Sequence, residues 1–168
     1  MHRTDHRAEV IPISTAPSAV TAESPVPAPR PGGHGRVGLV LVSHSEELAA
    51  AAGSLAVALG GGPDPAPVAT TGGSLADGPG TSAVLVAAAA RRVDQGHGVA
   101  ILADLGTAVT TVHALLAAAD EHGLPFPVRL ADAPFVEGAV AAVATATAGG
   151  DLAAVLDAAE EMYRQRKL

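Results

Sequence analysis

The sequence predicts an α/β protein with an open, mostly parallel β-sheet that carries helices on both faces. Three observations support this fold class: continuous apolar segments of strand length, a stretch of helical periodicity after most of them, and regular alternation of the two along the chain. Continuous apolar strands are typical of parallel sheets, because both faces of such a sheet are covered.

The first predicted strand begins at Val37 and reads VGLVLV before polar residues follow. Residues 46–59 form the first predicted helix, which would end at the glycines of residues 60–62. Its apolar residues recur at helical spacing and would form the buried face. They are Leu48, Ala52, Leu55 and Leu59.

A short strand is expected over residues 67–70, followed by a loop rich in Gly, Asp and Pro over residues 72–80. Thr81 or Ser82 would cap a second helix that runs to about Val93.

The second half repeats the pattern with a strand over residues 98–103 and a helix that continues to His122, where Gly123 supplies the C-cap. A strand over residues 128–131 follows. Two further helices are expected over residues 135–147 and 151–166, the latter with Asp151 as N-cap. Because bulky side chains are few, the last helices or a sheet edge are expected to be buried in a homodimer.

The composition excludes several classes of function. Aromatic residues make up 2% of the 168 residues and the net charge is -7, which argues against nucleic-acid binding. The absence of cysteine excludes disulfides, thiolate nucleophiles and Cys-ligated zinc, and cytoplasmic location is the default. No apolar segment is long enough for a membrane span.

Residues 1–35 differ in composition from the remainder. Six of the thirteen prolines lie in the first 31 residues, among Ser, Thr and Ala, with no apolar periodicity. Such a segment buries too little apolar surface to offset its ordering entropy, so we expect a disordered tail. The folded domain is expected over residues 36–168.

The residues that follow the strands are the candidates for chemistry, because ligands of open parallel sheets bind at the carboxyl ends of the strands. His44 follows the first strand, and Asp104 follows the strand of residues 98–103. A carboxylate that accepts the proton of one imidazole nitrogen leaves the other nitrogen free to attack. The pair therefore predicts nucleophilic catalysis by His44.

An anionic group is the expected target of that nucleophile. Ser45, Gly106 and Thr107 lie at predicted helix starts, whose free N–H groups bind phosphate oxygens. Further candidates for the same rim are Thr81, Ser82, Pro134 and Glu137. The sequence has no Walker motif and no carboxylate cluster for magnesium, so we expect no metal and no cofactor, and a phosphoprotein as donor.

Four segments in order carry a family resemblance: VGLVLVSHSEELA, GTSA, ILADLGTAVTTV and RLADAPFVEGAVAA. They resemble the phosphotransfer subunit of phosphoenolpyruvate-dependent dihydroxyacetone kinase, which is similar to the mannose-type enzyme IIA domain of the sugar phosphotransferase system. The resemblance runs from about Arg36 to the C-terminal helix. It implies a phosphotransferase subunit with this fold.

The resemblance also implies a phosphorylation site at His44, which Asp104 orients, with Gly106 and Thr107 at the phosphoryl site. Thr107 departs from the serine usual in the family but keeps the hydroxyl. The implied donor is the phosphorylated histidine-containing carrier protein. The implied acceptor is ADP on the nucleotide subunit of dihydroxyacetone kinase. Some family members are fused to the carrier domain and part of enzyme I, and here both are expected to be separate proteins.

Two alternatives stay open at this point. The same fold could act as a regulatory module that senses phosphorylation, or as the enzyme IIA component of a mannose-type sugar transporter. The S-H-S and D-L-G-T segments favour the kinase subunit over the transporter type, for which a more Gly-Gly-Ser-like loop after the aspartate is expected.

Overall fold

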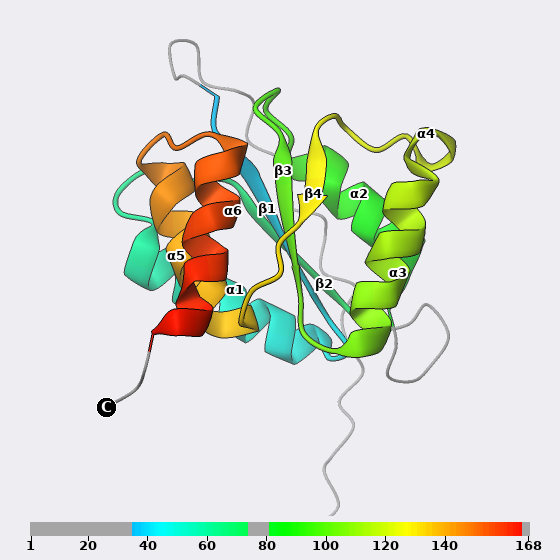
Figure 1. The fold of residues 1–168 in the computed structure, drawn as a ribbon, viewed down its shortest axis with the longest axis horizontal. Coiled ribbons are helices and arrows are strands. Elements are labelled where there is room, and N and C mark those ends of the chain that lie inside the picture. Colours follow the sequence, from blue (N-terminus) through cyan, green and yellow to red (C-terminus); the bar gives the residue numbers. More distant parts are fainter. Residues whose placement is uncertain (1–34, 74–80, 166–168) are drawn as a thin grey trace, which may run out of the picture.

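A computed structural model describes residues 35–73 and 81–165 of the chain. The predicted tail, up to residue 34, lies outside the described residues, as do residues 74–80 of the predicted loop. Strands and helices alternate as predicted, with two helices after the last strand (Figure 1). In chain order they are β1 (Gly38–Ser43), α1 (Glu46–Gly60), β2 (Val68–Gly72), α2 (Ala83–Val93), β3 (Val99–Ala103), α3 (Gly106–Ala117), α4 (Ala119–His122), β4 (Val128–Leu130), α5 (Phe135–Thr147) and α6 (Leu152–Glu160), followed by a 3₁₀ turn, η1 (Glu161–Arg164).

The four strands form one parallel sheet in the order β2-β1-β3-β4. Helices cover both faces, with α1, α5 and α6 on one face and α2 and α3 on the other (Figure 1). The predicted fold class is therefore confirmed. Because each crossover helix runs back antiparallel to its strand, the first turns of α1, α2, α3 and α5 lie at the carboxyl ends of the strands. None of the described helices is long and apolar enough to cross a membrane.

The strands bury alternate side chains in two cores. Leu39, Leu41 and Leu102 face α1 and α5, whereas Val40 and Ile101 face α2 and α3. The helices contribute mainly alanines to both cores. Small helical residues let the helices approach the sheet closely, which compensates for the scarcity of large apolar side chains.

The buried face of α1 differs from the predicted one. Only Ala52 of the predicted face is buried, and the other buried residues of the helix are Ala49, Gly53 and Ala56. The three leucines are exposed by 45% to 68%, namely Leu48, Leu55 and Leu59. The reason is steric, because a Cβ on Gly53 would lie 2.6 Å from Thr70 Cγ2 in β2. Large side chains on this face would hold the helix away from the sheet.

Two other helices differ from prediction. The expected helix to His122 divides at Ala118 into α3 and α4, although Gly123 forms the predicted C-cap with a positive φ of 59°. Asp151 caps α6 as predicted, accepting from the Ala154 N–H, but α6 ends at Glu160 and the chain continues as η1. The other predicted elements agree within a few residues, and Ser82 rather than Thr81 caps α2.

Candidate active site

Adjacent strands bring the two predicted reactive residues together. Val42 of β1 pairs with Ala103 of β3, and the Asp104 N–H donates to the Val42 carbonyl at 3.1 Å. Both strands end at this level, so the residues that follow them meet at the same edge of the sheet. His44 and Asp104 are therefore neighbours although sixty residues separate them in the sequence.

The imidazole of His44 lies between two partners. Its Nδ1 atom lies 3.0 Å from Asp104 Oδ1, and its Nε2 atom contacts the hydroxyl of Thr107. A carboxylate only accepts, so we assign the ring proton to Nδ1 and the lone pair to Nε2. The Thr107 hydroxyl then donates to Nε2. Because 22% of the His44 side chain is exposed, Nε2 lies at a surface that a partner can approach.

The Asp104 carboxylate accepts four hydrogen bonds. Oδ1 accepts from His44 Nδ1 and from the Leu105 N–H at 2.7 Å, while Oδ2 accepts from the Ser43 hydroxyl at 2.7 Å and the His44 N–H at 3.0 Å. Burial raises the pKa of Asp104, but these hydrogen bonds outweigh it, and the pKa lies below its ordinary value. Asp104 is therefore a fixed negative charge beside the imidazole.

Ser43 is a site residue that sequence reasoning missed. Its side chain is fully buried at the end of β1, where it donates to Asp104 and accepts from the Ser45 N–H at 3.1 Å. One sequence signal could have identified it: Ser43 is a polar residue at the end of the first predicted strand, directly before His44. Ser43 thus holds Oδ2 of the carboxylate, whereas the His44 ring contacts Oδ1.

Ser45 contributes to the site through the helix that it caps. Its hydroxyl accepts from the Leu48 N–H at 3.2 Å and donates to Glu47 at 2.8 Å, which lowers the pKa of Glu47. These contacts favour capping of α1 over direct binding of a phosphoryl group. By contrast, the N-cap of α3 is Leu105, which supplies no side-chain hydrogen bond. The first turn of α3, with Gly106 and Thr107, therefore keeps N–H groups that an anion beside His44 can use.

A family match covers this site. Residues 38–156 match the EIIA-man family model, described as the PTS system fructose IIA component. The chain belongs to the EIIA-man family. Membership assigns it to phosphoryl relay in the phosphotransferase system (PTS), which is a phosphotransferase activity. Both His44 and Asp104 lie within the matched EIIA-man domain.

The EIIA-man domain is similar to solved structures, among them the following one. It is the crystal structure of a protein of unknown function, EF1359, with a TM-score of 0.62 and 25% sequence identity over 75% of this chain and 94% of the other. No curated protein matches the chain. The structural similarity supports the α/β architecture.

The other rim candidates have structural contacts of their own in this EIIA-man domain. The hydroxyl of Ser82 accepts from the Leu85 N–H and so caps α2. Thr81 forms a bridge with Gly73, and its buried hydroxyl has no hydrogen-bond partner among the described residues. In the described part of the chain, neither Thr81 nor Ser82 forms a hydrogen bond with His44.

The segment of residues 134–138 positions α5. Pro134 is the N-cap residue and Glu137 lies in the first turn. Gly138 is buried, and a Cβ there would lie 2.9 Å from Ala133 Cβ and 3.2 Å from a methyl group of Leu102. These contacts explain Gly138 by the close packing of α5 on the end of β3.

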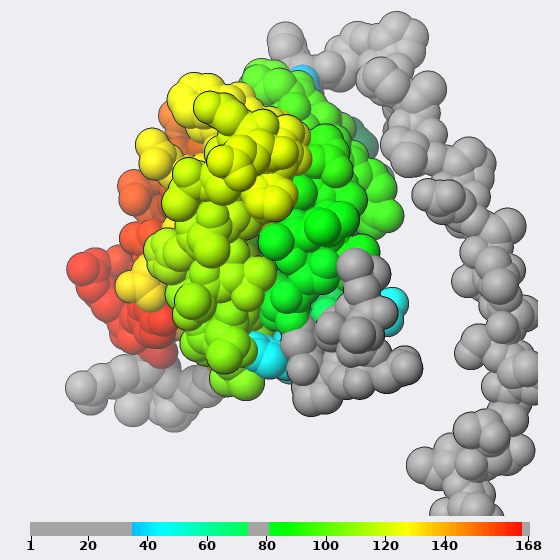
Figure 2. All heavy atoms as spheres, turned by 90° about the vertical axis from the view of Figure 1, so that its right-hand side faces the viewer, coloured from blue at the N-terminus to red at the C-terminus, as the bar shows by residue number. Residues whose placement is uncertain are grey.

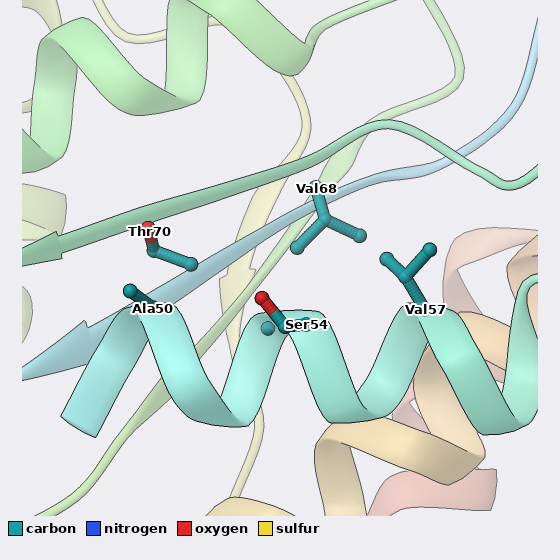
Figure 3. Close-up of a pocket in the computed structure, with 6 residues that line it drawn as sticks. Ala50, Ser54, Val57, Val68 and Thr70 are labelled. Atoms are coloured by element: carbon teal, nitrogen blue, oxygen red, sulfur yellow. The ribbon is translucent and has the colours of Figure 1, made fainter. Parts of the chain in front are cut away.

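A shallow groove of about 350 Å³ lies elsewhere, between α1 and the edge strand β2 (Figure 3). Ser54 and Val57 of α1 face Val68 and Thr70 across it. The groove includes neither His44 nor Asp104. Among the described residues, no cluster of three or more His, Asp or Glu side chains is arranged to hold a metal ion.

Proposed function

We propose that this EIIA-man chain accepts a phosphoryl group on Nε2 of His44 from the phosphorylated histidine-containing carrier protein. It then passes the group to ADP held by the nucleotide subunit of dihydroxyacetone kinase, and the resulting ATP phosphorylates dihydroxyacetone. One observation supports the relay above all others: Asp104 holds Nδ1 at 3.0 Å, which leaves Nε2 directed toward the uncapped start of α3.

The transfer follows from that geometry. The Nε2 lone pair attacks phosphorus, an N–P bond to His44 forms as the bond to the donor nitrogen breaks, and the electron pair returns to the donor. The Nδ1 proton stays in place, so the ring gains positive charge beside the Asp104 carboxylate. Thr107 must turn from Nε2, and its hydroxyl and the α3 amides then bind the phosphoryl oxygens.

Phosphorylation of His44 can be tested directly. Incubation with phosphoenolpyruvate, enzyme I and the carrier protein should add one phosphoryl group, about 80 Da, which is lost in acid and kept in alkali, unlike a phosphoserine. His44→Ala should abolish the addition. His97→Ala and His113→Ala serve as controls, because both residues are exposed on other parts of the surface. Phosphate uptake by the His44→Ala protein would contradict both the site and the relay.

The acceptor is tested in a second step. The phosphorylated protein is mixed with the ADP-loaded nucleotide subunit and dihydroxyacetone, and formation of dihydroxyacetone phosphate is measured. We expect the phosphohistidine to discharge only when the nucleotide subunit is present. If the protein is phosphorylated by the carrier but does not discharge, it still acts in the PTS, but dihydroxyacetone kinase is not its acceptor.

The proposed donor is a cytoplasmic carrier, so we place this chain in the cytoplasm as well. The sequence contains no cysteine, which agrees with that location.

A further inference from the structure

The groove between α1 and β2 is an uncharged hollow at one edge of the sheet. Small and β-branched residues line it, namely Ala50, Gly53, Ser54, Val57, Val68 and Thr70. Within it, the side chains of Ser54 and Val57 point toward Val68 and Thr70 (Figure 3). On the other face of the sheet, α2 and α3 lie side by side (Figure 2), whereas α1 is the outermost helix of its own face. A groove without charged groups favours an apolar occupant.

The backbone of β2 is open beside this groove. Among the described strands, β2 pairs with β1 alone. The Leu39 N–H of β1 donates to the Pro67 carbonyl at 2.9 Å, and alternate residues of a strand bond to the same neighbour. The N–H and C=O groups of Val68 and Thr70 therefore face the outer edge. Such an edge accepts a further strand, and proteins commonly cover it with another segment.

The described part of the chain begins next to this edge. The Arg36 N–H donates to Gln95 Oε1 at 2.9 Å. The guanidinium of Arg36 pairs at 2.9 Å with Asp64, in the segment that leads from α1 to β2. A Cβ on Gly35 would clash with the ring of His97, so the chain passes closely over that side chain. Residues 1–34 therefore join the domain at the amino end of the sheet, beside the start of β2.

The sequence Val-Ile-Pro-Ile at residues 10–13 has the chemistry that this edge requires. It begins a stretch without charge that runs to residue 22, and it holds two of the chain's three isoleucines. Isoleucine favours strands, and proline is tolerated in an edge strand where its missing N–H faces away from the sheet. In a strand, Ile11 and Ile13 lie on one face and direct their backbone groups to the same neighbour, whereas those of Pro12 face solvent.

The length of the chain allows this segment to reach the groove. Roughly 20 residues separate Ile13 from Gly35, and a chain of that length spans about 25 Å as a coil and about 65 Å as extended polyproline. The five residues of β2 span only about 17 Å. Because the segment and the groove belong to one chain, their effective concentration is in roughly the millimolar range. Weak strand pairing is therefore enough to occupy the edge.

We propose that residues 10–13 add a strand to the outer edge of β2, with Ile11 and Ile13 in the groove beside α1. This proposal does not depend on the relay through His44. The segment buries too little apolar surface by itself, which is why the sequence predicts disorder, but the groove supplies the surface that it lacks. The added strand covers an edge that would otherwise be free to pair with another chain.

Hydrogen exchange in the full chain tests the added strand. The double variant Ile11→Ser/Ile13→Ser removes the apolar side chains from the segment and leaves residues 35–165 unaltered. Val26→Ser is the matched control, because Val26 lies between two prolines, which donate no ladder hydrogen bonds. Amide exchange is followed residue by residue along β2.

We expect the amides of Val68 and Thr70 to exchange at least about fivefold faster in the double variant and at the original rate in the control. The amides of Ala69 and Thr71, which face β1, should exchange equally in all three proteins. Equal exchange at Val68 and Thr70 in the unaltered protein and the double variant would overturn the added strand. Equal acceleration in the control would overturn the assignment of residues 10–13 as that strand.

Disulfide formation tests the position of the segment, because the chain contains no cysteine of its own. Ile13→Cys is combined either with Ser54→Cys in the groove or with Ala153→Cys as a control. Ala153 is an exposed residue at the start of α6, near the amino end of the sheet and within reach of the same linker. A disulfide requires Cα atoms within about 7 Å of each other.

We expect the pair with Ser54→Cys to oxidise at least about tenfold faster than the control pair, as a bond within one chain. Equal rates for the two pairs would overturn the proposal, because the segment would then have no preferred position. A bond between two chains would also overturn it and would assign the groove to the same segment of a second copy.

Discussion

The Asp104 carboxylate determines which nitrogen of His44 is available for reaction. Two backbone N–H groups and the Ser43 hydroxyl hold the carboxylate before the ring contributes its own hydrogen bond. The carboxylate is therefore placed by the backbone and by Ser43 at the ends of β1 and β3 rather than by the His44 ring. Such pre-organisation avoids rearrangement when positive charge develops on the ring.

Asp104→Asn tests the control of the tautomer. An amide can donate to Nδ1, which would place the ring proton on Nε2 and remove the attacking lone pair. We expect a folded protein that accepts phosphoryl groups at least about tenfold more slowly, with the 10⁴-fold loss known for the equivalent change in a serine-protease triad as the upper limit. Single-turnover transfer from the phosphorylated carrier measures it. An unchanged rate would exclude Asp104 from the mechanism.

Ser43→Ala tests the hydrogen bond that supports Asp104. Because this bond helps to hold the pKa of Asp104 below its ordinary value, its removal should raise that pKa. A depressed carboxyl pKa stabilises the fold above the unfolded-state pKa, and this contribution is lost as the pH falls through the folded-state value. The variant should therefore lose stability at a higher pH during acid titration. NMR titration of the Asp104 carboxyl carbon measures the shift, and Ser54→Ala, an exposed serine of α1, is the control.

The meeting of His44 and Asp104 could be predicted from the sequence, because parallel strands end at a common edge. The role of Ser43 could not, since it depends on the register that places the end of β1 beside Asp104. The same holds for Ser45, whose hydroxyl is used by the cap of α1. Sequence alone identifies polar residues at a strand end but does not say toward which neighbour each one points.

Close contacts between helices and strands set the identity of several small residues. Gly38 begins β1 next to Val93, the last residue of α2, and a Cβ at Gly38 would clash with the Val93 carbonyl oxygen. Gly53 plays the corresponding role between α1 and β2. The helices thus pack tightly on the sheet because small residues lie where a helix comes closest to a strand.

Gly38→Ala should therefore destabilise the fold. The added methyl group meets a backbone carbonyl that cannot move without shifting α2, so we expect a loss of about 1–3 kcal/mol in the free energy of unfolding. Urea denaturation measures it. Gly106→Ala is the matched control, because nothing lies within 4 Å of the added Cβ, and its change should stay within about 0.5 kcal/mol. Equal stabilities would show that the α2 crossing is not tight.

The face of α1 shows where periodicity misleads. Leucines at helical spacing predict a buried stripe, but the structure buries Ala49, Ala52, Gly53 and Ala56. Periodicity identifies the helix correctly, because either stripe has the helical period. The choice between the two depends on the distance between α1 and β2, which is a property of the tertiary structure.

Self-association is the prediction for the whole molecule. The outer edge of β4 is unpaired among the described strands, and Phe126, which precedes β4 by two residues, is 90% exposed. We propose that burial of this apolar surface between two copies stabilises a homodimer. Light scattering at micromolar concentration should give about twice the chain mass of 16.4 kDa. A strict monomer would contradict the proposal.

Local patterns in the sequence determined the element order, the parallel sheet and the pair of His44 and Asp104 at its edge. These features depend on hydrophobic period, on capping residues and on the common edge at which parallel strands end, all of which are local or follow from topology. Tertiary structure decided the buried face of α1 and the hydrogen bond from Ser43 to Asp104. Each of these depends on distances between segments far apart in the chain, which the order of residues does not contain.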